Sequence, residues 1–239
     1  MAKRTFNPIW MAAASAVVAI SLWLTFSTSF MAKHESYDDM LAAARKMSEA
    51  TAEIKRMRAE LGIPIDPADD PNATGLIGQE LTDITTTVGN LQSKRTSTNP
   101  DFAALMVDYF DRLGIKGGDL VAVGASGSFP GIILSVLSAC YVTGVEPVLI
   151  PSIGASEYGA NIPGLTSVEM IDRLNGAGIF DYIPVAISLG GAGDVGEGGI
   201  IADSKPVLQR IAEESGHRII VPEDTSDSIR QRKAAFEAA

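Results

Sequence analysis

The segment from residue 120 to residue 131 constrains the fold of this chain most. Its sequence, Leu-Val-Ala-Val-Gly-Ala-Ser-Gly-Ser-Phe-Pro-Gly, runs from an apolar stretch through small residues to a proline. The apolar stretch has no alternation, which predicts a strand covered on both faces. Pro130 suits the first turn of a helix, where a missing N–H group costs nothing. The segment therefore predicts a strand, a turn and a helix in succession, the arrangement at which α/β proteins place binding sites.

The rest of the chain predicts the same alternation. Helices are expected at residues 99–113, 130–143, 166–174, 204–215 and 225–238, and strands at residues 120–123, 147–150, 183–188 and 218–221. Residues 84–91 are rich in β-branched residues and predict a strand or an extended segment. Thr166 and Glu169 form a capping-box pattern at the start of one helix. We therefore predict an α/β fold with a mainly parallel sheet and helices on both faces, a Rossmann-like three-layer arrangement.

The N-terminal region predicts a membrane anchor. Residues 9–30 are apolar, and no charged side chain lies between Arg4 and Lys33. A helix of this length spans a hydrocarbon layer of roughly 30 Å. Lys3 and Arg4 precede the segment, so the positive-inside rule places the N-terminus in the cytoplasm. We expect a single pass through the inner (cytoplasmic) membrane and an extracytoplasmic main domain. A cleaved signal peptide is the alternative, which the length of the segment and Phe30 near its end disfavour.

The predicted organisation has four parts. They are a cytoplasmic N-terminus and transmembrane anchor at residues 1–33, an amphipathic helix at 34–62, a proline-rich linker at 63–74 and an extracytoplasmic α/β domain at 75–239. Apolar residues recur every three or four positions between Met40 and Leu61, which is typical of an amphipathic helix. This helix is expected to pack on its own domain, to pair with another copy, or to lie beside a membrane partner.

Composition excludes some classes of function. The net charge of −10 argues against a nucleic-acid partner, because no basic stripe is present to replace the counterions of phosphates. The usual nucleotide-binding signatures are missing, and no cofactor or metal site is predicted. The single cysteine, Cys140, lies in an apolar helix and is expected to be a small core residue.

Three loops of similar character follow predicted strands, at residues 124–128, 151–161 and 190–199. They are rich in glycine and serine. In a parallel sheet they emerge at the same edge, so we expect them to line one crevice. The candidate ligand-binding residues in them are Gly124, Ser126, Gly127, Ser128, Ser156, Asn161, Gly190, Gly191 and Asp194, with Glu157 and Glu197 nearby.

The candidate catalytic residues are Ser126, Ser128 and Asp194, and whether the protein is an enzyme is left open. A serine nucleophile needs a base. His34 lies beside the anchor, and His217 begins a strand at the opposite edge of the sheet. Lys94 or Lys205 would serve instead if burial lowered its pKa.

Residues 82–104, the Gly-Ala-Ser-Gly-Ser-Phe-Pro turn and residues 188–194 resemble the poly-γ-glutamate system protein family. The resemblance runs from about Thr74 to Gly199 and includes the single N-terminal anchor. It implies a bacterial membrane-anchored protein encoded with the ligase and membrane subunits of poly-γ-glutamate synthesis. It implies a pathway and no reaction, since it carries over no catalytic residues.

Three hypotheses follow. The first is an accessory subunit of poly-γ-glutamate (capsule) synthesis or export, whose crevice binds a glutamate-type carboxylate or the polymer and whose partners are the synthase components. The second is an extracytoplasmic serine-type γ-glutamyl hydrolase or transferase. The third is an anchored binding protein unrelated to the polymer. Because the net charge opposes polyanion binding, Lys94 and Arg95 are the cations expected to hold a polymer.

Overall fold

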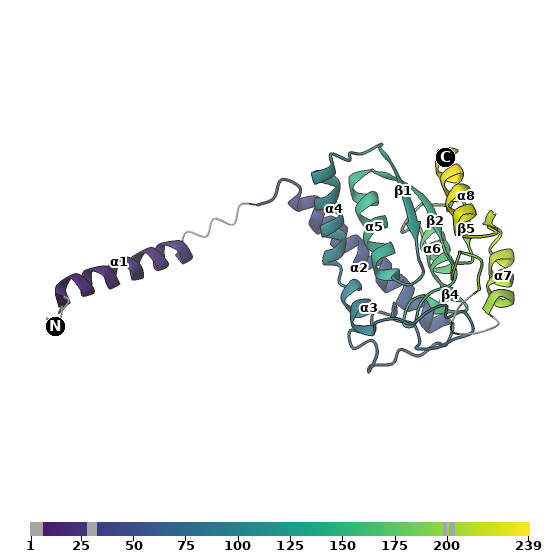
Figure 1. Ribbon diagram of the computed structural model, residues 1–239, viewed down its shortest axis with the longest axis horizontal. Helices are drawn as coiled ribbons and strands as arrows, with labels where there is room; N and C mark the ends of the chain where they lie inside the picture. Colours follow the sequence, from purple (N-terminus) through teal and green to yellow (C-terminus); the bar gives the residue numbers. More distant parts are fainter. Residues whose placement is uncertain (1–6, 28–32, 198–199, 201–203) are drawn as a thin grey trace, which may run out of the picture. The chain divides into compact units, whose positions relative to one another are not determined.

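The structure is a computed structural model that describes residues 7–27, 33–197, 200 and 204–239 (Figure 1). The chain forms two compact units, Met1–Glu35 and Ser36–Ala239. Eight helices and six short strands lie within the described residues, which confirms a mixed α/β architecture. The predicted basic pair Lys3 and Arg4, the end of the predicted apolar segment at residues 28–30, and residues 198–199 of the third loop lie outside the described residues.

The first unit contains helix α1 (Pro8–Ser27). The helix is long and apolar enough to cross a membrane, as the sequence predicts, although a signal sequence has the same property. Its side chains are exposed, and it carries both tryptophans of the chain, Trp10 and Trp23.

The second unit holds all the other elements. In chain order they are α2 (Tyr37–Glu60), α3 (Leu91–Ser97), α4 (Asp101–Leu113), β1 (Leu120–Ala125), α5 (Pro130–Thr143), β2 (Glu146–Pro151), β3 (Asn161–Ile162), β4 (Leu165–Thr166), α6 (Ser167–Gly176), β5 (Ile187–Ser188), α7 (Ser204–Ser215), β6 (Ile219–Ile220) and α8 (Thr225–Glu237). The predicted capping box at the start of α6 is present.

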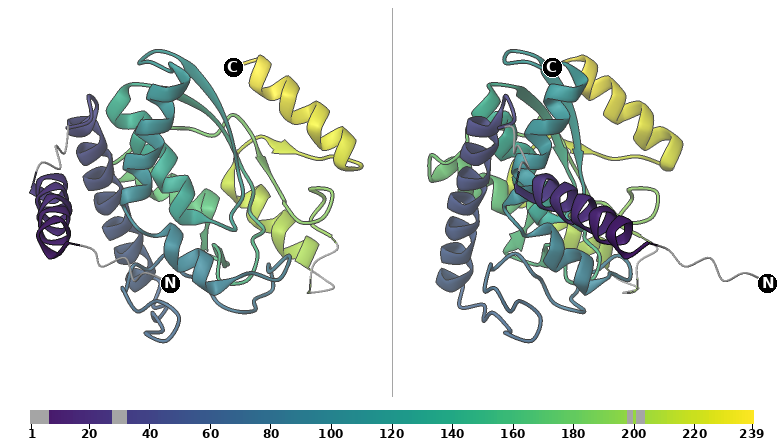
Figure 2. Two further views of the ribbon diagram at one scale, coloured as in Figure 1. Left: turned by 60° about the vertical axis from the view of Figure 1, so that its left-hand side comes forward. Right: turned by 90° about the vertical axis from the view of Figure 1, so that its left-hand side faces the viewer.

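The strands form small sheets (Figure 2). β1 pairs with β2 in parallel, β5 pairs with β6 in parallel, and β3 and β4 form a short antiparallel pair. A parallel bridge between Ser152 and Ser188 links the ends of β2 and β5, and the Val185 N–H donates to the Leu149 carbonyl at 3.0 Å. The four parallel strands therefore follow one another in the order β1, β2, β5, β6. The strands predicted at residues 183–188 and 218–221 are shorter than expected.

Neighbouring residues of β2 belong to different core clusters. Leu149 lies in the cluster that contains Leu134 of α5. Ile150 lies in the cluster that contains Ala186, Ile220 and Ala235 of α8. Because successive side chains of a strand point to opposite faces, α5 and α8 lie on opposite faces of β2.

Strand β1 differs from the prediction, which had it covered on both faces. Leu120, Ala122 and Gly124 are exposed, whereas Val121 and Val123 are half-buried against the core. β1 ends the row of parallel strands, and the cluster beneath α8 contains residues of β2 and β6 but none of β1. One face of β1 therefore remains open to solvent.

Helix α2 packs on its own domain, one of the three alternatives considered for the amphipathic segment. It lies against α4 and α5, and Ala43, Met47, Ala50 and Ile54 on one of its faces are fully buried. The apolar spacing of the sequence therefore reflects a core contact. Burial of each large apolar side chain among these contributes about 1.5–3 kcal/mol.

Residues 84–90 form an extended segment, one of the two alternatives considered, and not a regular strand. Thr85 forms a single isolated bridge with Ala155, and its hydroxyl oxygen accepts a hydrogen bond from the Thr82 N–H at 2.8 Å. The segment then leads into α3, which the Asn90 side chain caps by accepting from the Ser93 N–H at 2.9 Å. Lys94 and Arg95, for which no helix was predicted, therefore lie on a helix.

Candidate functional site

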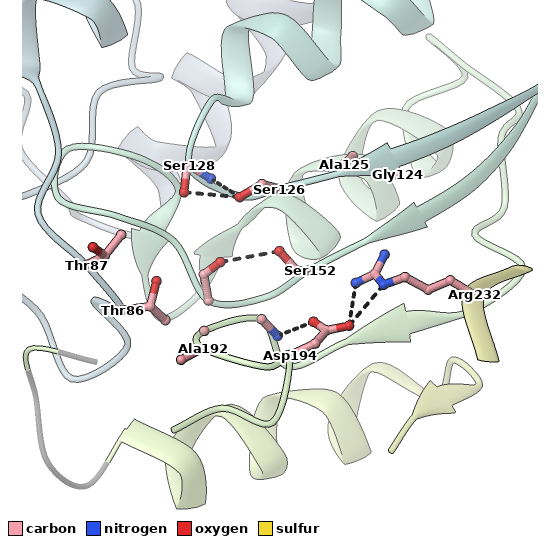
Figure 3. A pocket seen from close by; sticks show the side chains of 13 residues that line it. Thr86, Thr87, Gly124, Ala125, Ser126, Ser128, Ser152, Ala192, Asp194 and Arg232 are labelled. Carbon is pink, nitrogen blue, oxygen red and sulfur yellow. Dashed lines mark hydrogen bonds and ion pairs between the residues drawn. The ribbon is translucent and has the colours of Figure 1, made fainter. Parts of the chain in front are cut away.

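A cavity of about 560 Å³ lies where β1, β2 and β5 end (Figure 3). Hereafter we call it the crevice. It is lined by Thr86, Thr87, Gly124, Ala125, Ser126, Ser128, Ser152, Gly154, Gly190, Gly191, Ala192, Asp194 and Arg232. Six predicted site residues are among them: Gly124, Ser126, Ser128, Gly190, Gly191 and Asp194. The ends of parallel strands thus bring the three loops together, as the order of the strands requires.

The turn after β1 supplies two serine hydroxyls. The Ser126 Oγ donates to the Ser128 Oγ at 3.1 Å and accepts from the Ser128 N–H at 3.2 Å. The Ser128 Oγ also accepts from the Ser156 N–H at 3.0 Å, and the Phe129 N–H donates to the Ser126 carbonyl. These backbone N–H groups are therefore engaged within the protein, so the serine hydroxyls are the groups that the turn presents to a ligand.

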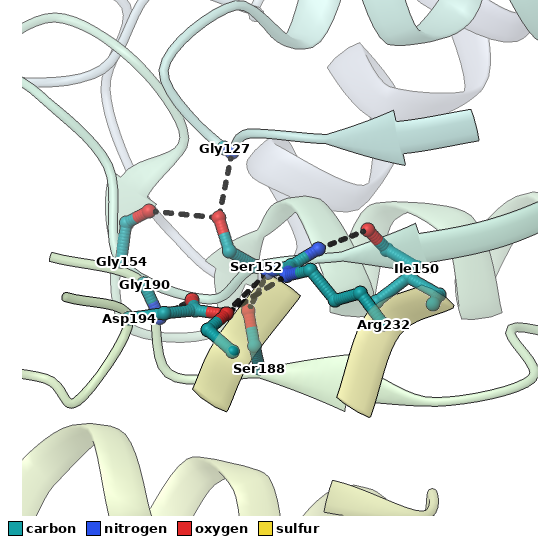
Figure 4. Close-up of polar contacts among 9 residues, drawn as sticks. Gly127, Ile150, Ser152, Gly154, Ser188, Gly190, Asp194 and Arg232 are labelled. Carbon is teal, nitrogen blue, oxygen red and sulfur yellow. Dashed lines mark hydrogen bonds and ion pairs between the residues drawn. The ribbon is translucent and has the colours of Figure 1, made fainter. Parts of the chain in front are cut away.

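Asp194 is held from several directions in the loop after β5 (Figure 4). Its Oδ1 accepts from the Gly190 N–H at 3.1 Å, and its Oδ2 accepts from the Ser228 hydroxyl at 2.7 Å. Its φ of +67° lies in the left-handed region, which is uncommon for a residue other than glycine. A carboxylate in a costly backbone conformation, fixed by several donors, is typical of a functional loop.

Arg232 reaches the crevice from α8 and pairs with Asp194. Its Nε and Nη2 donate to the Asp194 Oδ2 at 2.9 and 2.7 Å. Its Nη2 also donates to the Ser188 hydroxyl at 2.5 Å, and its Nη1 approaches the Ile150 carbonyl at 3.5 Å. Arg232 is the only cation among the described residues that line the crevice. One positive and one negative charge therefore balance there.

Sequence reasoning missed Thr86, Thr87, Ser152 and Arg232. Ser152 directly follows β2, so the rule that selected Ser126 also indicates it. Thr86 lies at the crevice because its N–H donates to the Ala155 carbonyl at 2.8 Å. Arg232 lies far along the chain from the three loops, and no local pattern indicates its position.

Five predicted ligand-binding residues do not line the crevice, and three of them, Gly127, Ser156 and Asn161, belong to the loops after the strands. The Gly127 N–H is buried and points to the Ser152 hydroxyl at 3.4 Å. Ser156 is buried behind the turn. Asn161 is fully buried, and its side chain donates to the Gln79 carbonyl at 2.7 Å and accepts from the Gln79 N–H at 3.0 Å. These residues support the walls of the crevice.

Lys94 also lies behind the crevice, and only 2% of it is exposed. Its Nζ donates to the Ser156 hydroxyl at 2.6 Å and to the Ser128 carbonyl, and it lies 3.7 Å from the centre of the Phe129 ring. Burial lowers the pKa of Lys94 to about 8. Arg95 lies apart from the crevice and donates to the carbonyls of residues 68 and 69.

The other candidate bases are engaged away from the serines. His217 pairs with Asp172 at 2.9 Å, and Lys205 pairs with Glu197 at 2.6 Å. Neither His217 nor Lys205 lines the crevice. Within the part of the chain that the structure describes, no group of three or more His, Cys, Asp or Glu residues is arranged to hold a metal ion. As far as the described residues go, the crevice therefore offers hydroxyls and one ion pair, and no base contacts the Ser126 hydroxyl.

No family model, curated protein or solved structure matches this chain. The function of the protein is therefore inferred from the chemistry of the crevice and from the sequence motifs at residues 82–104 and 188–194.

Proposed function

We propose that the protein is a membrane-anchored accessory subunit of bacterial poly-γ-glutamate synthesis or export, whose crevice binds a γ-glutamyl group. The observation that carries this proposal is the composition of the crevice. Hydroxyls from three separate segments surround the Asp194–Arg232 pair, and among the described residues no base contacts the exposed serine, Ser126. The carboxylate of Asp194 is paired with Arg232, and such a set of hydrogen-bonding groups is suited to binding rather than to acyl transfer.

The chemistry of a γ-glutamyl group agrees with this lining. Its carboxylate accepts hydrogen bonds from hydroxyls and from a guanidinium, and its amide both donates and accepts. The volume of about 560 Å³ lies in the range of small-molecule sites. The ion pair holds Arg232 in place, so a bound carboxylate meets a donor that is already oriented.

The pathway, the location and the finer fold belong to the same proposal. The resemblance of residues 82–104 and 188–194 supports the pathway, with the ligase and membrane subunits as partners. The apolar helix α1 supports a single pass through a membrane. That this is the inner membrane belongs to the proposed pathway, and that the domain lies outside the cytoplasm follows from Lys3 and Arg4 by the positive-inside rule. The placement of α5 and α8 on opposite faces of β2 supports a Rossmann-like sheet with helices on both faces.

Filling the crevice tests the proposal. An added Cβ at Gly124 meets nothing within 4 Å, and Gly124 lies on the open face of β1. Gly124→Leu therefore places a side chain in the crevice without backbone strain. Gly176→Leu is the matched control, because an added Cβ at Gly176 also meets open space and Gly176 does not line the crevice.

The readout is calorimetric titration of the full chain in detergent with a γ-glutamyl dipeptide. We expect wild type and Gly176→Leu to bind, and Gly124→Leu to bind at least about tenfold more weakly, a loss of about 1.4 kcal/mol. In the producing bacterium, deletion of the gene should reduce exported polymer, and Gly124→Leu should not restore it. Absence of dipeptide binding by wild type would contradict the proposal and favour an anchored binding protein unrelated to the polymer.

A second candidate is a serine-type γ-glutamyl hydrolase or transferase. The observation that favours it is Lys94, whose pKa is lowered by burial to about 8 and whose Nζ lies 2.6 Å from the Ser156 hydroxyl. Such an amine is able to accept a proton near neutral pH. Incubation of the polymer with the protein tests this candidate: wild type should shorten the polymer, and Ser126→Ala combined with Ser128→Ala should not.

A further inference from the structure

We propose that a second site, separate from the crevice, binds a carboxylate-bearing chain. It is a groove of about 730 Å³ between α2, residues 71–74 and the region from α3 to the start of α4. Hereafter we call it the α2 groove. Its lining residues are Ser48, Thr51, Ala52, Lys55, Pro71, Asn72, Ala73, Thr74, Gln92, Arg95, Thr96, Thr98, Asn99 and Pro100. Among the residues that the structure describes, this lining contains two cations, Lys55 and Arg95, and no carboxylate, although the chain has 29 acidic residues.

The two cations have no carboxylate partner within the described residues. Lys55 is exposed on α2, and no hydrogen bond or ion pair of its side chain is recorded there. Arg95 donates only to the backbone carbonyls of Ala68 and Asp69. Both charges are therefore available to an anion from outside.

The nearest acidic segment turns its carboxylates away from the α2 groove. Asp66, Asp69, Asp70 and Glu80 line a different cavity, on which Arg58 also lies. Asp70 is buried, and its carboxylate accepts from neighbouring groups of its own segment. The carboxylates thus share one cavity with Arg58, whereas Lys55 and Arg95 line the other without a carboxylate among the described residues. A groove that keeps positive charge on a protein of net charge −10 attracts anions locally.

The neutral groups of the α2 groove narrow the chemistry of the ligand. The Thr51 hydroxyl oxygen is buried without a hydrogen-bond partner among the described residues, which is costly unless a bound molecule supplies one. The side chains of Asn72 and Gln92 add amides, which both donate and accept. Cations together with amides match a chain that carries carboxylates and peptide-like amides. A phosphodiester surface would accept from the cations and from the amide N–H groups, but it would offer no donor to the amide oxygens.

The identity of that chain as poly-γ-glutamate rests on the proposed function. Each ion pair at an exposed site contributes little by itself, so a single glutamate should bind weakly here. A polymer that places several carboxylates and amides along the α2 groove should bind more tightly than separate glutamates, because its first contact holds the other groups close to their partners. Binding should therefore rise with polymer length and fall with salt.

Charge reversal tests the inference on the full chain in nanodiscs of zwitterionic lipid. The probe is a fluorescently labelled poly-γ-glutamate oligomer, and the readout is fluorescence anisotropy. Lys55→Glu replaces an attraction by a repulsion toward the carboxylates of the oligomer, so it should weaken binding by about fivefold. The matched control is Lys116→Glu, an equal change of net charge at another exposed lysine, outside the α2 groove. The control should bind within about twofold of wild type.

The outcomes separate this inference from the proposed function. Equal weakening by both reversals would assign the effect to net charge and overturn the inference. Loss of oligomer binding in Gly124→Leu but not in Lys55→Glu would place the polymer in the crevice, overturning the inference and keeping the proposed function. Loss in Lys55→Glu alone supports the α2 groove. If Lys55→Glu reduced binding to anionic lipid vesicles and not to the oligomer, a membrane surface would be the ligand and the inference would fail.

Discussion

Because Lys94 is buried, the free energy of unfolding of the second unit should rise with pH in the alkaline range. Its amine is buried, and its hydrogen bonds to the Ser156 hydroxyl and the Ser128 carbonyl connect the loops after β2 and β1. Burial lowers the pKa of Lys94 from 10.5 to about 8. In the unfolded chain the same amine returns to its ordinary pKa. Replacing it by Lys94→Met removes the titration while keeping an unbranched side chain.

The sign and size of the effect follow from the two pKa values. Between pH 8 and pH 10.5 the unfolded chain holds the proton more tightly than the folded chain, so the free energy of unfolding rises with pH in this range. The cost of the buried charge is fully present below pH 8 and is lost as the pH approaches 10.5. This difference between the two pKa values changes the free energy of unfolding by about 3 kcal/mol, at about 1.4 kcal/mol per pKa unit.

The measurement is urea unfolding of the full chain in detergent, followed by circular dichroism from about pH 7 to about pH 10.5. The free energy of unfolding of wild type minus that of Lys94→Met should rise by about 3 kcal/mol across this range. Only the change of this difference with pH reports the Lys94 charge, because the substitution also removes hydrogen bonds and so shifts the free energy of unfolding at every pH. Lys116→Met, at an exposed lysine, should give a flat difference. If the difference between wild type and Lys94→Met changed by less than about 0.5 kcal/mol over this pH range, the claim that the Lys94 ammonium is desolvated would be refuted.

Two further predictions concern the packing around α5. Gly131→Ala should lower the free energy of unfolding by about 1–3 kcal/mol, because the new Cβ would lie 2.2 Å from the Ser97 carbonyl oxygen. Gly176→Ala, whose Cβ meets open space, should be neutral or should raise the free energy of unfolding by up to about 1 kcal/mol. Equal effects of the two substitutions would contradict the close packing of α5 against Ser97. The Cys140 thiol should react with a disulfide reagent only after unfolding, since it is fully buried and burial raises its pKa to about 12; rapid labelling of the native protein would contradict this.

Periodic patterns predicted the helices well, because the pattern itself is the cause of the packing. The apolar spacing from Met40 to Leu61 became the buried face of α2, and the Thr166–Glu169 pair became a capping box. The β-branched residues at 84–88 left a strand and an extended segment as alternatives, and the structure has the extended segment. Their preference for strands depends on a neighbouring strand, and here Thr82 and Thr85 bond to each other and to Asn161 instead.

The candidate site was predictable where it depends on strand order and unpredictable where it depends on distant packing. The loops after β1 and β5 were expected to meet because parallel strands end at one edge, and Ser126 and Asp194 line one cavity. Lys94 and Arg95 are adjacent on a short helix, which turns one inward and the other toward the α2 groove. The capping residue Asn90 is the local sequence feature that indicates this helix. The partner of Asp194 is Arg232, and no spacing within the chain indicates that contact.

Both tryptophans of the chain lie on α1, Trp10 near its start and Trp23 near its end, about 20 Å apart at about 1.5 Å per residue. The second unit has none. Tryptophan emission therefore reports the surroundings of α1 alone, whereas tyrosine signals report the second unit. If α1 enters a bilayer, depth-dependent quenchers would report the depths of Trp10 and Trp23, and unfolding of the second unit would leave this signal unchanged. A single unlabelled sample would thus report on α1 and on the folding of the second unit separately.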